Sequence, residues 1–388
     1  MKDKRNLLFG IIVATVMITS VTLGILLPPT FEIEIPEDSK LYVINKSENI
    51  FAINVTEFMS ITERSFEIEL IPFLFMYSAD DFYNLTIIST IDGAYTFTRS
   101  QLLDSILELG AKGFMLKINQ ETFYSVQGLA LDIDYFSVDI APTIYKTLNF
   151  VDWETDGTPV TYTNNTGISK VLFIHLDGFG WRFWDNLTDK GFIDLEFNIL
   201  FNQPCLTAYP SITNVATATM VSGFWPASTG VTTRQNHILN VDSIFDVAAE
   251  NNCSTEIIEG EAGFINIEAD YESWLPDINN SGSNDDEIYQ KTIESLNSSR
   301  SELLFTHFHG IDDVGHSYGP YSTEWLLKVE EIFTYLSNIV NYVDNETLVI
   351  ISADHGMHIN DVVEDYRIGT HGESRWEDML VPLIIARK

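Results

Sequence analysis

The segment from His309 to Pro320, HGIDDVGHSYGP, contains the densest group of residues that could bind a metal ion. Asp312 and Asp313 lie between His309 and His316, although the chain has only 8 histidines in all. Imidazole nitrogens and carboxylate oxygens are the common protein ligands of zinc and related divalent ions. The segment therefore predicts a metal site.

Further acids and histidines stand at the ends of predicted strands. Those strands are Val171 to Leu176, Leu303 to Phe308, Thr347 to Ser352 and Val381 to Ala386. Asp177 follows the first, the His309 to Pro320 segment follows the second, Asp354 and His355 follow the third, and His371 precedes the last. Any one such residue, taken alone, is better explained as a helix-capping aspartate or a hydrogen-bonded core histidine. The four positions together favour one shared site, because α/β sheets bind ligands at strand ends.

The arrangement of strands and helices predicts two parts. From residue 168 to 388, strands alternate with helices at Val215 to Val221, Ser243 to Glu250 and Trp325 to Val343. Such alternation predicts an α/β domain with a mostly parallel sheet flanked by helices. From residue 30 to 163, short runs of alternating apolar and polar residues predict a smaller β-rich domain, with one helix from Ser100 to Leu109 closed by Gly110.

The N-terminus carries a predicted membrane anchor. Residues 7–27 are apolar and uncharged, which is long enough to cross the roughly 30 Å hydrocarbon core of a membrane. Residues 1–6 include Lys2, Lys4 and Arg5, so the positive-inside rule predicts a cytoplasmic tail and an extracytoplasmic remainder. A cleaved signal peptide is the alternative. Both interpretations place the bulk of the chain outside the cytoplasm, the first at the cell membrane as a single-pass protein.

Composition restricts the partners. A net charge of -35 argues against DNA or RNA, whose binding is driven by neutralisation of phosphates. Cys205 and Cys253 are the only cysteines and allow either one disulfide or two buried thiols. Acceptor motifs for N-glycosylation, expected of an extracytoplasmic glycoprotein, occur at Asn45, Asn54, Asn84, Asn164, Asn186, Asn279, Asn297 and Asn345.

Five motifs together carry a resemblance to a known family. In chain order they are LDGFGW, PSITNVATATMVSG, DDVGHSYGP, ADHGM and THGE. From Val171 to the C-terminus the chain resembles the alkaline phosphatase superfamily, and most closely its type I phosphodiesterase/nucleotide pyrophosphatase family. The resemblance implies an alkaline phosphatase-like fold with two divalent metal ions, most simply Zn²⁺, with Mn²⁺ or Fe also compatible.

The resemblance also implies roles for individual residues. Asp312, His316 and His371 match the ligands of one ion, and Asp177, Thr213, Asp354 and His355 match the ligands of the other. Thr213 matches the nucleophile, which would form a phospho-threonine intermediate during cleavage of a phosphodiester or phosphoanhydride bond.

Other residues near these motifs are assigned by the surrounding sequence. Gly315 is expected to permit a turn between the two ligands of the DDVGHSYGP motif. Asp313 is expected to be solvated or to contact a ligand, and His307 and His309 are expected to be strand or lining residues and not ligands. His358 has no clear assignment.

The substrate side departs from the family pattern. The family usually has Thr-Phe-Pro-Asn at the nucleophile, where this chain has Thr213-Asn214-Val215-Ala216, so the aromatic that helps to hold a nucleobase is missing. Arg234 and Asn236 are the candidates for binding phosphate, Arg234 because guanidinium can pair with two phosphate oxygens.

The predicted function is a membrane-anchored extracytoplasmic metallohydrolase. Its expected partners are a phosphate-ester or nucleotide-type small molecule and, through the anchor, membrane lipid. Two alternatives remain: a phosphoethanolamine-type head-group transferase built on the same core, and a non-catalytic cell-surface glycoprotein.

Overall fold

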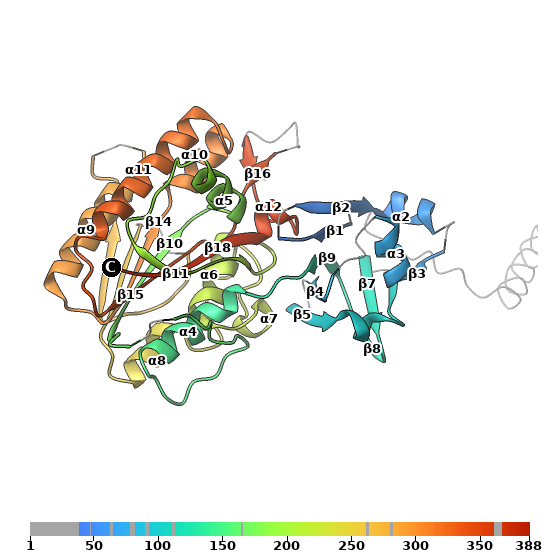
Figure 1. The fold of residues 1–388 in the computed structure, drawn as a ribbon, viewed down its shortest axis with the longest axis horizontal. Coiled ribbons are helices and arrows are strands. Elements are labelled where there is room, and N and C mark those ends of the chain that lie inside the picture. Colours follow the sequence, from blue (N-terminus) through green and yellow to red (C-terminus); the bar gives the residue numbers. More distant parts are fainter. Residues whose placement is uncertain are drawn as a thin grey trace, which may run out of the picture.

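The computed structural model describes residues 39–46, 48–62, 65–77, 82–89, 93–110, 113–163, 166–260, 264–279, 282–360 and 367–388. The predicted anchor at residues 7–27 and the tail before it lie outside these ranges. Within them, no helix has both the length and the apolar character needed to cross a membrane. The described residues form a mixed α/β structure with a β-rich lobe and an α/β lobe (Figure 1).

The β-rich lobe contains two sheets. The first has the strand order β2-β1-β9-β4-β5 and the second the order β3-β6-β7-β8. Its strands are β1 (Lys40–Ile44), β2 (Asn49–Asn54), β3 (Glu67–Glu69), β4 (Asn84–Ser89), β5 (Gly93–Thr98), β6 (Ile106–Gly110), β7 (Gly113–Ile118), β8 (Glu121–Phe123) and β9 (Val126–Leu131). Two short helices, α2 (Val55–Ile61) and α3 (Leu70–Met76), cover them. Their shared core is aromatic and aliphatic, with Phe58, Phe73 and Phe114 fully buried.

The helix predicted from Ser100 to Leu109 is wrong. Only a short 3-10 turn, η1 (Arg99–Leu102), forms there, and β6 follows it. Leu107 and Leu109 are buried while Ile106 and Glu108 are half-buried, which is the alternation of a strand. The leucines also fit helical spacing, but β6 gains backbone hydrogen bonds on both sides, from β3 and β7. Tertiary pairing therefore overrides the local pattern.

The α/β lobe is built on one sheet of order β11-β18-β15-β10-β14-β12-β13. Its strands are β10 (Lys170–Leu176), β11 (Asn198–Leu206), β12 (Thr255–Gly260), β13 (Tyr271–Leu275), β14 (Leu303–Phe308), β15 (Thr347–Ser352) and β18 (Leu380–Arg387). The other elements are η2 (Ser137–Asp139), α4 (Ile140–Thr147), α5 (Trp181–Asp189), α6 (Thr213–Ser222), α7 (Pro226–Thr229), α8 (Ile244–Glu250), α9 (Asp285–Ser298), α10 (Gly310–Tyr318), α11 (Thr323–Ile339), α12 (Trp376–Met379), β16 (His358–Ile359) and β17 (Gly369–Thr370).

The last strand runs against its neighbours in a sheet that is mostly parallel, as predicted. Strands β10, β12, β13, β14 and β15 run parallel, whereas β18 is antiparallel to β15 and to β11. The residues before an antiparallel strand lie at the same sheet edge as the residues after its parallel neighbours. Because β18 is reversed, His371, which precedes it, lies on the side of the sheet that carries Asp177 and Asp354.

Helices cover both faces of this sheet. Figure 1 shows α9, α10 and α11 on one side and α4, α6 and α8 on the other. Helix α11 illustrates why: Ser322 accepts the Trp325 N–H at its start, and an apolar stripe spaced three to four residues apart is buried. The stripe is Trp325, Val329, Ile332, Phe333, Leu336 and Ile339. Cys205 and Cys253 are buried in the same lobe and unpaired, so they form no disulfide.

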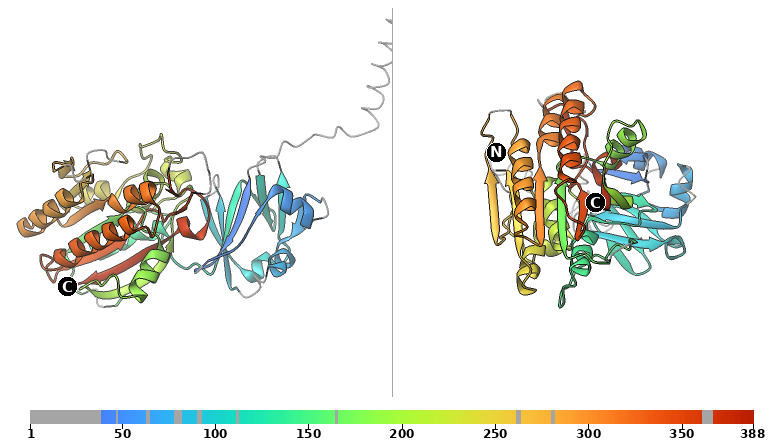
Figure 2. Two further views of the ribbon diagram at one scale, coloured as in Figure 1. Left: turned by 90° about the horizontal axis from the view of Figure 1, so that it is seen from above. Right: turned by 60° about the vertical axis from the view of Figure 1, so that its left-hand side comes forward.

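The two lobes meet at a small apolar cluster. Tyr42, Ile44 and Ile88 of the β-rich lobe pack with Leu206 and Leu380 of the α/β lobe. The left view in Figure 2 shows the lobes end to end along the long axis of the molecule. The contact therefore joins the first sheet to the start of β18.

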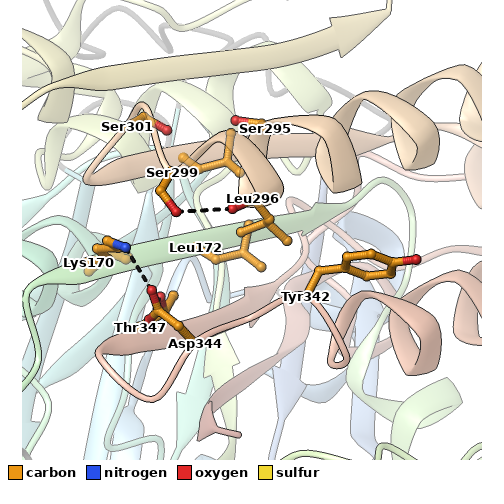
Figure 3. A pocket seen from close by; sticks show the side chains of 11 residues that line it. Lys170, Leu172, Ser295, Leu296, Ser299, Ser301, Tyr342, Asp344 and Thr347 are labelled. Carbon is orange, nitrogen blue, oxygen red and sulfur yellow. Dashed lines mark hydrogen bonds and ion pairs between the residues drawn. The ribbon is translucent and has the colours of Figure 1, made fainter.

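A small pocket lies at the opposite edge of the α/β sheet, where β10 and β15 begin (Figure 3). Its single lysine, Lys170, forms an ion pair with Asp344 at 2.7 Å, and no histidine lines it. The pocket lacks a set of converging metal donors, so the site that the motifs predict lies at the other edge.

Candidate metal centre

The predicted ligands converge where the parallel strands end. Asp177 follows β10 directly, and Asp354 and His355 follow β15 by one residue. Asp312 and His316 lie one turn apart on α10, which begins two residues after β14. The structure brings all seven residues predicted as ligands into two adjoining groups.

The first group contains Asp312, His316 and His371. His316 Nε2 lies 3.2 Å from Asp312 Oδ2, and His371 Nε2 lies 3.9 Å from Asp312 Oδ1. One donor atom from each residue lies within 4.8 Å of the others, so the group could hold a metal ion. Its members are the three residues that the sequence assigns to one ion.

The second group is centred on His355. Its Nε2 lies 3.4 Å from Asp177 Oδ1, 3.2 Å from Asp354 Oδ2 and 3.3 Å from Thr213 Oγ1. The rings of His355 and His371 stack at 3.5 Å, so the two groups adjoin. The four residues that the sequence assigns to the other ion therefore lie together.

Backbone carbonyls set the tautomer of each histidine in these groups. His316 Nδ1–H donates to Gly369 O, His355 Nδ1–H to Gly356 O and His371 Nδ1–H to Ser211 O, at 2.8 to 2.9 Å. A carbonyl only accepts, so Nδ1 carries the proton and the Nε2 lone pair faces the carboxylates in a neutral ring. Metal-ligating histidines are oriented in this way.

Three buried carboxylate oxygens support the fit to a cation. Asp177 Oδ1, Asp312 Oδ1 and Asp354 Oδ2 have no hydrogen-bond partner, and all three residues are at least nine-tenths buried. Burying an ionised carboxylate without compensation is costly. Divalent cations bound by these oxygens and by the imidazoles would remove that cost, and the mixed N and O donor set suits zinc.

The Asp312 and Asp354 carboxylates stay ionised at neutral pH, because the pKa of each is lowered. Burial is the strongest single influence and acts to raise the pKa of Asp312, but the hydrogen bond from His316 and the neighbouring imidazoles of His371 and His355 together outweigh it and lower the pKa to about 2. For Asp354, His355 and His175 outweigh burial and hold the pKa well below its usual value. Burial and the adjacent His355 ring hold the pKa of His371 well below its usual value, which leaves that imidazole neutral.

Two glycines allow the close packing around the ligands. Gly315 is inside helix α10 and not in a turn as predicted; a Cβ there would lie 2.5 Å from Met357 Sδ. Gly178 has φ +72°, and a Cβ there would lie 2.8 Å from Asp312 Oδ1. Gly315 is therefore required for close contact alone, and Gly178 both for close contact and for its left-handed backbone conformation.

The phosphate-binding candidates differ in their surroundings. Arg234 is exposed, and its Nη2 donates to His371 Nε2 at 3.3 Å. Asn236 uses its amide nitrogen to donate to Gly230 O and its oxygen to accept the Ile238 N–H. Asn214, beside Thr213, ties their loop to α6 by donating to the carbonyls of Thr233 and Asn236.

Sequence reasoning missed a second polar layer behind Asp177. Glu259 at the end of β12 contacts His307 and His309, and the ring of His175 stacks on that of His307 at 3.7 Å. Asp313, by contrast, is exposed, as a solvated acid would be. The only signal in the sequence was the spacing of His307 and His309, which are two residues apart and therefore point to the same face of a strand. That spacing does not show that Glu259 on another strand is their partner.

One family model matches part of the α/β lobe. Residues 268–370 match the model of the family described as type I phosphodiesterase / nucleotide pyrophosphatase. The family resemblance predicted from the sequence is confirmed. The matched segment contains Asp312, His316, Asp354 and His355 and ends one residue before His371.

Curated relatives of the chain are phosphoethanolamine transferases. It is 30% identical over 76 residues to the catalytic subunit of GPI ethanolamine phosphate transferase 3 from Homo sapiens, covering 20% of this chain and 7% of that protein. It is 35% identical over 101 residues to GPI ethanolamine phosphate transferase 1 from Gibberella zeae, covering 24% of this chain and 10% of that protein. The chain thus spans about a tenth or less of the length of these relatives.

Solved structures with a similar arrangement include two hydrolases. Murine ectonucleotide pyrophosphatase/phosphodiesterase 5 matches with a TM-score of 0.44 and 15% identity, over 56% of this chain and 88% of that one. Phosphonoacetate hydrolase from Sinorhizobium meliloti 1021 matches with a TM-score of 0.43 and 13% identity, over 55% of this chain and 62% of that one.

Proposed function

We propose that the protein is a membrane-anchored, extracytoplasmic two-metal hydrolase that cleaves a phosphodiester or phosphoanhydride bond through a phospho-threonine intermediate on an alkaline phosphatase-like fold. The observation that carries the proposal is the convergence of Thr213 Oγ1 with Asp177, Asp354 and His355 at the end of the parallel strands. The family to which the chain is similar supports a reaction at phosphorus. The anchor proposal rests on residues 7–27 alone.

Thr213 suits the role of nucleophile by its place in the chain. It is the first residue of α6, where the backbone N–H groups of the first turn have no intrahelical acceptor and favour a bound anion. Thr213 is also 5% exposed, so its hydroxyl is reached only from the site. Divalent ions, when bound to the two groups, would supply Lewis-acid stabilisation of the threonine alkoxide and of the leaving oxygen.

The proposed reaction has two displacements. Thr213 Oγ1 attacks phosphorus and the bond from phosphorus to the leaving oxygen breaks, which releases an alcohol or phosphate. Water then attacks the phosphorus held on Thr213, the bond to Oγ1 breaks, and the threonine hydroxyl is restored. Arg234 is placed to turn from His371 to a phosphoryl oxygen, and Asn236 is the second candidate on the same loop.

The test compares two threonines of one helix. The full chain, loaded with Zn²⁺ in detergent, is assayed on bis(p-nitrophenyl) phosphate and on p-nitrophenyl phosphate. Thr213→Ala should abolish diester turnover, whereas Thr217→Ala, one turn further along α6, should retain it because the buried Thr217 Oγ1 forms no hydrogen bond. Mass spectrometry of acid-quenched enzyme should locate the phosphoryl adduct on Thr213. Full activity of Thr213→Ala would contradict the mechanism.

A head-group transferase is the second candidate, because the curated relatives are named as GPI ethanolamine phosphate transferases. In that reaction an alcohol replaces water in the second displacement. Incubation with phosphatidylethanolamine micelles should then release diacylglycerol and leave phosphoethanolamine on Thr213. A diester hydrolase would turn over the chromogenic diester and leave the lipid intact.

A further inference from the structure

A group of two histidines and two carboxylates lies behind the centre already described. His307 is the fifth residue of β14, His309 follows that strand, and Glu259 is near the end of the neighbouring strand β12. The imidazole rings of His307 and His309 lie 3.9 Å apart and are tilted by 40°, and the His307 side chain is fully buried. The carboxylate of Asp177 faces them from β10, so three adjacent strands supply the group.

Asp177 faces two sites with its two oxygens. Oδ1 lies 3.4 Å from His355 Nε2 in the centre described above. Oδ2 lies 3.5 Å from His307 Nε2 and 3.6 Å from His309 Nδ1. These separations are long for N–H···O hydrogen bonds. They match a zinc ion with bonds of about 2.0 to 2.1 Å in tetrahedral geometry, which sets ligand atoms roughly 3.3 to 3.5 Å apart.

Glu259 orients both imidazoles toward Asp177. His307 Nδ1–H donates to Glu259 Oε2 at 3.1 Å, and His309 Nε2–H donates to Glu259 Oε1 at 2.5 Å. With those nitrogens protonated, loss of the second proton from each ring on metal binding would leave the opposite nitrogens with lone pairs that face the same point as Asp177 Oδ2. A carboxylate that accepts the far N–H of a ligating histidine is a recurring feature of zinc sites.

His307 has an unsatisfied nitrogen aimed into this group. Its Nε2 is inaccessible to solvent and forms no hydrogen bond, although the residue is fully buried. Buried polar nitrogens are nearly always paired. The group therefore has a donor set, an orienting carboxylate and an unmet bonding requirement.

We propose that Asp177 Oδ2, His307 Nε2 and His309 Nδ1 bind a third divalent cation, with Zn²⁺ as the best match to two nitrogens and one oxygen. Glu259 acts as the positioning residue, and Asp177 bridges the third cation to the centre that contains His355. The sequence assigns His307 and His309 to the strand or its lining, so this role differs from that expectation. The site stands on its own contacts and does not require the proposed hydrolase reaction.

The first experiment counts ions with a matched histidine control. The full chain is stripped with chelator, reloaded with Zn²⁺ and desalted, and zinc per chain is measured by plasma mass spectrometry. His309→Gln should hold one zinc fewer than the wild type. His358→Gln should match the wild type, because His358 is also buried against a carboxylate, Asp378 at 2.6 Å, but is in none of the donor groups found among the described residues.

Anomalous diffraction locates the ion directly. Crystals loaded with Zn²⁺ should show a peak at the zinc edge between Asp177, His307 and His309, and that peak should vanish in His309→Gln. Equal zinc content in His309→Gln and the wild type, or no peak there while the centre with His355 is filled, would overturn the site.

A second variant keeps the test decisive if His309→Gln does not fold. Glu259→Gln preserves shape but cannot accept both imidazole N–H groups as a carboxylate does, so zinc titration should show the weakest wild-type site loosened by roughly 10- to 100-fold. An unchanged titration would overturn the proposal. Diester turnover without the third ion would refute this site alone, and a third ion without turnover would refute the proposed reaction alone.

Discussion

The β-rich lobe and the α/β lobe both bury a large apolar core, but only the second gathers metal donors within the described residues. The difference follows from strand direction. In the α/β lobe, β10, β14 and β15 run parallel, so the residues that follow them meet at one edge. In the β-rich lobe most neighbours are antiparallel and their ends alternate between edges. Parallel strands are therefore what concentrates the chemistry here.

The β-rich lobe nevertheless contacts the segment that carries His371. Tyr42 Oη donates to Glu373, and Asn49 donates to Glu377 Oε2 at 2.6 Å while it accepts the Trp376 N–H at 2.9 Å. The segment lies between a candidate ligand and β18. We therefore expect substitutions in the α/β lobe site to cause the largest losses of turnover and bound zinc. Substitutions in either core should lower the unfolding free energy, and substitutions at the contact between the lobes should change turnover only slightly.

The largest effect is expected from Asp312→Asn. The substitution keeps the volume of the side chain but removes a charge shared by His316 and His371. Diester turnover should fall by at least about 10³-fold, a typical loss for an essential site residue, with loss of bound zinc. Asp134→Asn, which breaks the exposed pair with Lys46 beside the β-rich lobe, should leave both unchanged. Equal losses in the two variants would remove the contrast between the lobes.

The next largest effect is the loss of unfolding free energy when a substitution creates a cavity in the core of either lobe. Phe58→Ala and Phe305→Ala each remove a fully buried ring, one from each lobe, and each should cost about 3 to 5 kcal/mol of unfolding free energy. Calorimetry should show Phe58→Ala lowering an early transition of the β-rich lobe while zinc content is retained. A single transition shifted equally by both variants would show that the lobes unfold together.

A smaller effect is expected from Tyr42→Phe. The loss of one hydrogen bond to a carboxylate should cost about 1.5 to 3 kcal/mol at most, since Tyr42 is 8% exposed. Turnover should fall only several-fold, because His371 keeps its bond to Ser211 O. Urea unfolding and steady-state kinetics measure the two effects, and Tyr83→Phe, an exposed tyrosine of the same lobe, is the control. A loss as large as that of Asp312→Asn would place Tyr42 in the chemistry.

The smallest effect concerns pH and Asp139, at the start of α4. Burial raises the pKa of Asp139 to about 6, against the N–H groups of Thr158 and Phe136, which act to lower it. The folded protein therefore binds this proton more tightly than the unfolded chain, so the stabilisation is complete below about pH 4 and is lost as pH rises to about 6. The unfolding free energy of the wild type relative to Asp139→Asn should fall over that interval by at most about 3 kcal/mol, and thermal unfolding of both proteins at several pH values measures it. A difference constant from pH 4 to 7 would contradict the shift.

Much of the α/β lobe could be predicted because its strands are unbroken apolar runs. Strands β14 and β15 match the predicted ranges residue for residue, and α11 differs only at its ends. The β-rich lobe was harder, since its short segments satisfy helical and strand spacing alike, as at Leu107 and Leu109. The antiparallel direction of β18 was also beyond local pattern, because it depends on which neighbours pair across the sheet.

The sequence by itself determined which residues could bind metal, because Asp and His types, their order and their position after apolar runs are local properties. It also determined the family resemblance and the apolar segment at residues 7–27. Only the tertiary structure decided that His371 joins Asp312, that Asp177 faces two groups, and that Glu259 orients His307 and His309. Those relations join strands far apart in the chain, and their geometry arises from sheet register and strand direction, which no single segment encodes.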